Sequence, residues 1–116
     1  NPNDPVESLR GGVKFLLYLD KFWMKRVPKT NERIKFILAS YNIGQGHVED
    51  AWRLTLKYGK DNQNWGEVSN YLNLKSDPTY YRDPVVKSGY AKGHIAVNYV
   101  RDVLGLFQSY KALVNP

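Results

Sequence analysis

Apolar residues recur every three or four positions along most of this chain, and no segment alternates apolar and polar residues as a β-strand does. A chain with only this period buries its apolar side chains by packing helix against helix. The spacing therefore predicts an all-α fold, in one domain because the chain has 116 residues. The predicted helices cover residues 5–25, 31–42, 47–58, 64–74 and 90–113.

Capping residues stand at the ends of these segments. Asp4 precedes Pro5, which is favoured at the first position of a helix, and Glu7 follows this cap by three residues. Thr30 and Asn64 are expected as N-caps, and Gly44 and Gly59 are expected to end helices. Glu49 and Asp50 are expected in the first turn of the third helix, where acids suit the helix dipole.

The first predicted helix carries apolar residues on two stripes. They comprise Leu9, Val13, Leu16 and Leu17 on one side and Phe15, Leu19, Phe22 and Trp23 on the other. We therefore expect this helix to be buried on most sides. Gly11 and Gly12 weaken a helix relative to alanine, so we expect another backbone to pack closely against them.

Charge and composition restrict the kinds of site. The formal net charge of +6 favours an anionic partner, such as nucleic acid, an acidic membrane surface or the bacterial cell wall. The chain has no cysteine, which excludes disulfides, zinc thiolates and thiol nucleophiles. The longest apolar run, residues 15–19, is far shorter than the roughly 20 residues that span a bilayer. His47, Glu49 and His94 lack the spacing of a metal site, and we expect no metal and no cofactor.

The segment ASYNIGQG, residues 39–46, ends one predicted helix with a phenol, a carboxamide and two glycines. Glycine leaves the backbone bare enough for a ligand to approach. Tyr41 offers a flat ring, and Asn42 offers donors and an acceptor suited to an acetamido group or to hydroxyls. Asn42 and Gly44 also suit a plain helix stop, and the residues alone leave both interpretations open.

Residues 75–89 contain two Asp-Pro turns and no sustained period, which predicts a long loop. Within it, Tyr80 or Tyr81 offers a stacking platform in the wall of a cleft. A packed loop without a ligand is the alternative.

Three segments of the chain resemble the motifs of one known family. Residues 39–51, ASYNIGQGHVEDA, resemble the motif Ala-x-Tyr-Asn-x-Gly-x-Gly-x-Val, and residues 89–103, GYAKGHIAVNYVRDV, resemble a closing Tyr-Val helix. Residues 4–19, DPVESLRGGVKFLLYL, are similar to Asp-Pro-x-x-x-Ile-x-Gly-Gly-x-x-Tyr-Leu, with Leu9 in place of Ile and Phe15-Leu16 in place of Tyr-Leu. The family is that of the lytic transglycosylases of the soluble-lysozyme-like type, and the resemblance is closest to its membrane-bound branch, type F. It covers nearly the whole chain.

The resemblance implies a lysozyme-like helical domain that cleaves the β-1,4 bond between N-acetylmuramic acid and N-acetylglucosamine in peptidoglycan without water, giving a 1,6-anhydro product. One glutamate of this family acts first as acid and then as base, unlike the two carboxylates of ordinary glycosidases. By resemblance, Tyr41 and Asn42 line the cleft beside that glutamate with Gly44 next to them, and Tyr99 points at it. The expected partners are peptidoglycan glycan strands, in the periplasm or attached to the outer membrane.

The sequence departs from the family where catalysis is concerned. The family's Glu-Ser helix and Gly-Leu-Met-Gln motif precede the Asp-Pro segment with which this chain begins, and neither motif is present. The chain's glutamates suit caps and first turns better than catalysis: Glu7, Glu32, Glu49 and Glu67. We therefore expect the catalytic glutamate to lie upstream of residue 1, and residues 1–116 to form the C-terminal portion of the domain.

Without that upstream helix, we expect apolar side chains to be exposed between Val13 and Phe22 or along the last helix, and either self-association through them or a rearranged first helix. Two other functions stay open at this point. One is a non-catalytic module that binds peptidoglycan or another sugar. The other is a basic helical nucleic-acid binder, although we do not expect nucleic acid as a partner.

Overall fold

The computed structural model describes residues 4–115, and over these residues it contains helices and turns but no strand. The helices are α1 (Pro5–Met24), α2 (Thr30–Ile43), α3 (Gln45–Lys57), α4 (Trp65–Asn73), α5 (Pro78–Tyr81) and α6 (Gly93–Val114), with a 3₁₀ turn, η1, at Leu74–Ser76. The all-α prediction is confirmed. None of these helices is both long and apolar enough to cross a membrane.

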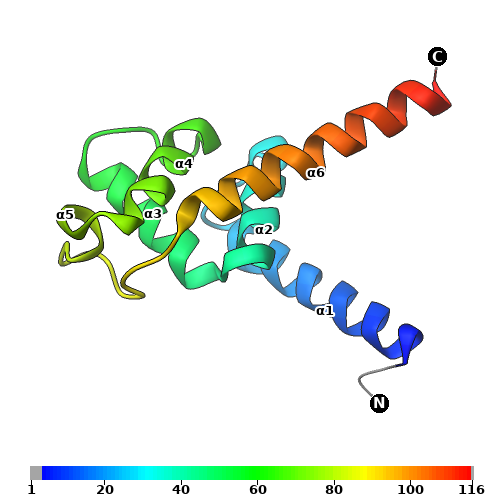
Figure 1. The fold of residues 1–116 in the computed structure, drawn as a ribbon, viewed down its shortest axis with the longest axis horizontal. Coiled ribbons are helices and arrows are strands. Elements are labelled where there is room, and N and C mark those ends of the chain that lie inside the picture. The colour runs from blue at the N-terminus through cyan, green and yellow to red at the C-terminus, as the bar shows by residue number, and fades with distance from the viewer. Residues whose placement is uncertain (1–3, 116) are drawn as a thin grey trace.

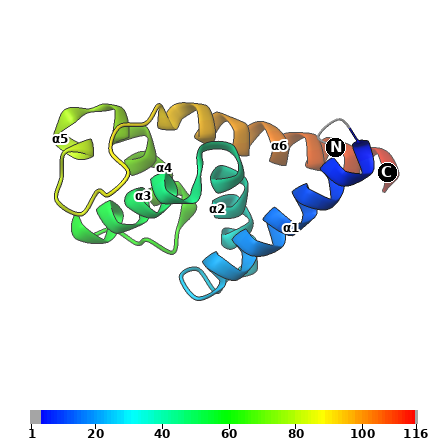
Figure 2. The same cartoon turned by 90° about the horizontal axis from the view of Figure 1, so that it is seen from below.

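Helix α2 lies at the centre, where it contacts α1, α3, α4 and α6. Helices α3, α4 and α5 form one end of the molecule (Figure 1). Helices α1 and α6 run out from the other side of α2 (Figures 1 and 2), and in the view of Figure 1 they spread apart toward the two ends of the chain.

The core is built around the indole of Trp23. Its ring nitrogen donates to Ser40 Oγ at 2.8 Å, and its ring lies 5.1 Å from that of Phe36, which in turn lies 5.2 Å from that of Trp65. The other buried side chains around these rings are Val27, Ala39, Val48, Ala51, Val68, Leu72, Ala96 and Val100. The core therefore joins the end of α1 to α2, α3, α4 and the first half of α6.

Two of the predicted caps are present. Asp4 Oδ1 accepts a hydrogen bond from the Val6 amide at 2.9 Å, and Asn64 Oδ1 accepts one from the Glu67 amide at 3.0 Å. Thr30 is not a cap, because α2 begins at Thr30 itself and the preceding lysine caps the helix without a side-chain hydrogen bond.

Gly44 both ends α2 and begins α3. Its φ of +102° is a conformation that a residue with a Cβ rarely adopts, so a glycine is required here. Because α3 starts at Gln45, Glu49 and Asp50 lie beyond its first turn. The prediction that they are first-turn acids was therefore wrong.

The outer part of α1 is exposed, and the prediction that α1 is buried on most sides was wrong. Of its side chains only Leu19 and Trp23 are buried, whereas Leu17 is 65% exposed. Gly11 and Gly12 have no neighbouring backbone within 4 Å of a built Cβ, so they do not serve close packing. The outer end of α6 is exposed too, at Leu106, Phe107, Tyr110 and Leu113. Exposed apolar side chains thus occur on both helices, as the resemblance predicts.

Gly93, the first residue of α6, lies against the end of α4. A Cβ built at Gly93 would lie 1.8 Å from the carbonyl oxygen of Leu72 and 2.4 Å from its carbonyl carbon. Only glycine allows this approach, which sets where α6 begins and therefore where residues 90–92 lie.

Gly93→Ala should lower the free energy of unfolding by at least about 2 kcal/mol, because the Leu72 backbone has to move to admit the methyl group. Gly105→Ala is a matched control in the same helix. No atom lies within 4 Å of a Cβ built there, so that variant should gain up to about 1 kcal/mol. Urea unfolding followed by circular dichroism measures both, and equal stability of the two variants would contradict the close approach at Gly93.

Candidate functional site

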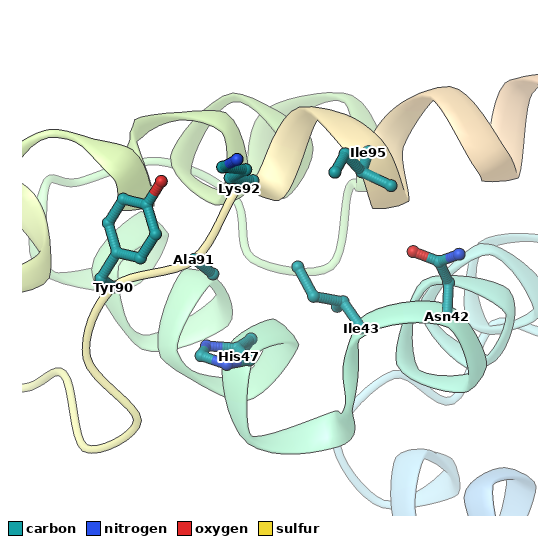
Figure 3. A pocket seen from close by; sticks show the side chains of 7 residues that line it. All are labelled: Asn42, Ile43, His47, Tyr90, Ala91, Lys92 and Ile95. Atoms are coloured by element: carbon teal, nitrogen blue, oxygen red, sulfur yellow. The ribbon is translucent and has the colours of Figure 1, made fainter.

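A cavity of about 340 Å³ opens between the junction of α2 with α3 and the segment that leads into α6 (Figure 3). Its lining residues are Asn42, Ile43, His47, Tyr90, Ala91, Lys92 and Ile95. They come from two short segments, 42–47 and 90–95. These segments fall within two of the motifs that carry the family resemblance.

Asn42 is the predicted site residue that lines this cavity. It is exposed, and its side chain makes no hydrogen bond to any residue between 4 and 115. The stop of α2 is made by Gly44, whose amide donates to the carbonyl of Ser40 at 2.9 Å. The helix-stop interpretation therefore fits Gly44, while the Asn42 carboxamide has no capping role and is open to a ligand.

Tyr81 and Tyr80 are separated, although they are adjacent in sequence. The Tyr81 ring meets the ring of Tyr90 edge to face, with centroids 5.7 Å apart, so it supports a side chain that lines the cavity. The Tyr80 ring instead packs with those of Tyr58, at 5.6 Å, and Tyr71, at 6.2 Å. The segment around them, predicted as a loop, contains the short helix α5.

Tyr41 and Tyr99 do not line the cavity. The Tyr41 ring lies on the α1 side of α2, 5.7 Å from the ring of Phe15. Tyr99 lies on α6 and is partly buried. Of the site residues predicted from the sequence, Asn42 lines the cavity, and Tyr81 contacts the lining residue Tyr90.

Three polar lining residues were missed by the sequence interpretation: His47, Tyr90 and Lys92. His47 was considered only as a metal ligand, which its spacing argued against, and the other two were assigned no role. All three lie within the two motifs that carry the family resemblance, and both motifs contribute to one cavity. The motifs were therefore the signal that could have pointed to these residues.

A buried charged network lies behind the cavity and ties its two segments together. Lys75 and Asp50 have no exposed surface, and Lys75 Nζ lies 2.5 Å from Asp50 Oδ2. Lys75 Nζ also lies 2.9 Å from His47 Nδ1. The Asp50 carboxylate accepts further hydrogen bonds from the amides of Lys87, at 2.8 Å, and Ser88, at 2.9 Å. Helix α3, η1 and the segment before α6 therefore meet at one carboxylate.

The protonation states in this network follow from its contacts. Burial alone would raise the pKa of Asp50, but the hydrogen bonds from Lys75 and from the amides of Lys87 and Ser88 outweigh burial and hold the pKa below its ordinary value. Burial, and then the positive charge of Lys75, lowers the pKa of His47. Asp50 is therefore a carboxylate and His47 a neutral imidazole at neutral pH.

None of the chain's glutamates lines the cavity: Glu7, Glu32, Glu49 and Glu67. For Glu32, burial raises the pKa, but the hydrogen bonds from Lys35 and the Trp65 amide lower it by more than burial raises it. The net shift of the Glu32 pKa is therefore downward. A general acid needs the opposite shift. Glu49 is held by two arginines, Arg26 at 3.0 Å and Arg53 at 3.1 Å. Within residues 4–115, no group of three or more His, Cys, Asp or Glu side chains is placed to hold a metal ion.

Known proteins are similar to this chain over most of its length. No protein-family model matches the chain. Among curated proteins, it is 41% identical over 112 residues to the membrane-bound lytic murein transglycosylase F of Vibrio vulnificus, which is 94% of this chain and 20% of that protein. The homologue of the same name from Yersinia pestis is 44% identical over 103 residues, 86% of this chain and 20% of that protein.

The chain is homologous to a segment of membrane-bound lytic murein transglycosylase F. A third relative of that name, from Vibrio cholerae, is 41% identical over 109 residues, 91% of this chain and 19% of that protein. The chain thus spans about a fifth of the length of the curated relatives it matches. The resemblance found in the sequence motifs is confirmed, and the transglycosylase F relatives imply a lysozyme-like helical fold.

Asp50→Asn should lower the free energy of unfolding by about 3–5 kcal/mol, because it leaves the buried Lys75 ammonium without its counter-charge. Asp102→Asn, at an exposed pair with Arg101, is the matched control and should change stability by less than about 0.5 kcal/mol. The folded-state pKa of Asp50 lies below the ordinary value of 3.8, so its contribution is present above that pH and is lost as the pH falls through the folded-state pKa. Urea unfolding at pH 7 and in acid measures both effects. A loss at pH 7 no larger than that of the control would contradict the network.

Proposed function

We propose that this chain is the C-terminal portion of a peptidoglycan lytic transglycosylase domain, and that its cavity at Asn42 is a sugar-binding wall of that domain. The parent protein cleaves the bond between N-acetylmuramic acid and N-acetylglucosamine and leaves a 1,6-anhydro product. The observation that carries the proposal is the 41% identity to transglycosylase F over 94% of the chain. Two of the motifs that carry the resemblance contribute residues to the cavity, which supports the assignment of the site.

The lining of the cavity suits an amide-bearing sugar. Ile43, Ala91 and Ile95 provide apolar surface, and Asn42 provides both donors and an acceptor (Figure 3). The volume, about 340 Å³, is at the lower end of small-molecule sites, which suits one sugar unit of a longer strand.

The acid–base glutamate of this proposal comes from a part of the parent outside residues 1–116. The chain's own glutamates lie away from the cavity, and Glu49 is neutralised by two arginines. Tyr41, on the α1 side of α2, and Tyr99, on α6, are proposed to face that glutamate rather than the cavity.

The partners and location follow from the same proposal. Peptidoglycan strands are the partner, and the parent acts in the bacterial envelope, in the periplasm or attached to the outer membrane. Self-association of the isolated chain through the exposed apolar side chains of α1 and α6 is a further prediction, which a light-scattering mass of a monomer would contradict. No observation favours the nucleic-acid binder or the non-catalytic module.

The complete parent should release 1,6-anhydro muropeptides from murein sacculi, and the 116-residue chain alone should release none, because none of its carboxylates is placed to protonate a bound glycosidic oxygen. Mass spectrometry of the two digests measures this. Anhydro products from the isolated chain that disappear in a Glu→Gln variant would show that the acid had been assigned to the wrong part of the protein. Absence of anhydro products with the complete parent would overturn the proposed activity.

Asn42→Asp in the complete parent should weaken binding of chitooligosaccharides by about 1–3 kcal/mol, the cost of a mismatched buried polar contact, and should change stability by less than about 1 kcal/mol. Asn70→Asp is the matched control, since Asn70 is exposed on α4 and does not line the cavity. Tyr99→Phe, measured beside them, tests whether the Tyr99 hydroxyl, which is proposed to face the glutamate, contributes to binding. Titration calorimetry gives the affinities. An unchanged affinity for Asn42→Asp would mean that residues 39–46 form a turn without a role in sugar binding.

A further inference from the structure

His47 places one ring nitrogen against a buried cation, and its side chain lines the cavity. Its Nδ1 lies 2.9 Å from Nζ of Lys75, which has no exposed surface. An ammonium group only donates hydrogen bonds, so Nδ1 has to accept, and the single proton of the neutral ring has to sit on Nε2. A doubly protonated ring would instead place an N–H against the ammonium, which is why Lys75 lowers the pKa of His47.

The Nε2 atom is accessible. In the described part of the chain, only Nε1 of Trp52 is a buried side-chain polar atom without a hydrogen-bond partner. Nε2 of His47 makes no hydrogen bond to residues 4–115 either, so it cannot be buried. His47 is one of the side chains that line the cavity (Figure 3), and its Nε2–H is an accessible donor without a partner among residues 4–115.

The lining residues of the cavity match the parts of one chemical group. The N–H of a neutral imidazole can donate to a carbonyl oxygen. The apolar side chains of Ile43, Ala91 and Ile95 suit a methyl group, and the oxygen of the Asn42 carboxamide suits an amide N–H. An acetamido group contains a carbonyl, a methyl and an amide N–H.

We propose that His47 is a specificity-determining residue of this cavity, donating from Nε2 to the carbonyl oxygen of an N-acetyl group, and that Lys75 is the positioning residue that fixes this tautomer. The choice of an N-acetylated sugar as the ligand rests on the proposed function. Lys75 is itself fixed by Asp50, at 2.5 Å. Asp50 also accepts hydrogen bonds from the amides of Lys87 and Ser88, so one network holds both the ring and the segment that leads to the opposite wall.

Selectivity against de-N-acetylated sugars follows from the same arrangement. A sugar with a free amine carries an ammonium, which offers Nε2–H no acceptor. It would also meet the positive charges of Lys75, behind the ring, and Lys92, on the lining. The cavity should therefore prefer chitotetraose to the corresponding tetramer of glucosamine.

The tautomer is tested without a ligand. Long-range ¹H–¹⁵N NMR of the histidine rings in the 116-residue chain should show His47 protonated on Nε2 and unprotonated on Nδ1 at pH 7. Lys75→Met should remove the bias and give a mixture of tautomers, which a purely structural role of Lys75 would not produce. A proton on Nδ1, or an imidazolium, in the unmodified chain would overturn the proposal.

Binding is tested by titrating the complete parent with chitotetraose. His47→Leu should weaken binding about tenfold, the size of one hydrogen bond, whereas His47→Gln, whose amide N–H lies near the position of Nε2, should stay within about threefold of the unmodified protein. His94→Leu is the matched control, because His94 is exposed on α6 and does not line the cavity, and it should have no effect. The unmodified protein should bind the glucosamine tetramer at least about tenfold more weakly than chitotetraose, and His47→Leu should reduce that preference.

The outcomes separate this proposal from the proposed function. Normal release of anhydro muropeptides with unchanged chitotetraose affinity in His47→Leu overturns the role of His47 alone. Equal affinity of the unmodified protein for the two tetramers also overturns it. If the complete parent neither cleaves murein nor binds chitotetraose, both the activity and the acetamido ligand are wrong, and the NMR result still decides the role of Lys75.

Discussion

The buried carboxylate of Asp50 holds the functional end of this molecule in place. Among the apolar side chains of the segment between α5 and α6, only Ala91 is buried, and polar contacts fix the path of the residues before it. Asp50 binds two of its amides, Arg53 donates to the carbonyl of Val85 at 3.0 Å, and Lys57 pairs with Asp83 at 2.7 Å. All three side chains come from α3. Charges on one helix therefore fix residues 83–88, which lead to the cavity wall, while the close approach of Gly93 to Leu72 sets where residues 90–92 lie.

Sequence patterns predicted the helices well because their ends are local. Asp4 and Asn64 cap helices through residues two or three positions away, and Gly44 stops one through its own φ. Asp50 was misinterpreted because an acid near a helix start fits the helix dipole without any tertiary contact. Its true partner, Lys75, is 25 residues distant in a segment predicted as a loop. A buried ion pair of this kind has no local signature.

Burial of α1 was predicted incorrectly for a different physical reason. Apolar periodicity states which face of a helix can be buried, and says nothing of whether a partner is present to bury it. Leu19 and Leu17 belong to the same helix, and only Leu19 meets the core. Among the residues that line the cavity, Asn42 was named from its motif, whereas His47, Tyr90 and Lys92 needed the fold to bring two motifs together.

The outer turns of α1 and α6 extend away from the core (Figures 1 and 2). There, each helix is held chiefly by its own backbone hydrogen bonds, and a helix of that kind is only marginally stable in water. Amide protons on those turns should therefore exchange with solvent through local fraying, within times set by helix–coil opening. Those of α2, which contacts four other helices, exchange only when the whole core opens. One continuous chain thus contains two levels of kinetic protection, and the boundary on α1 lies near Leu19, where the helix meets the core.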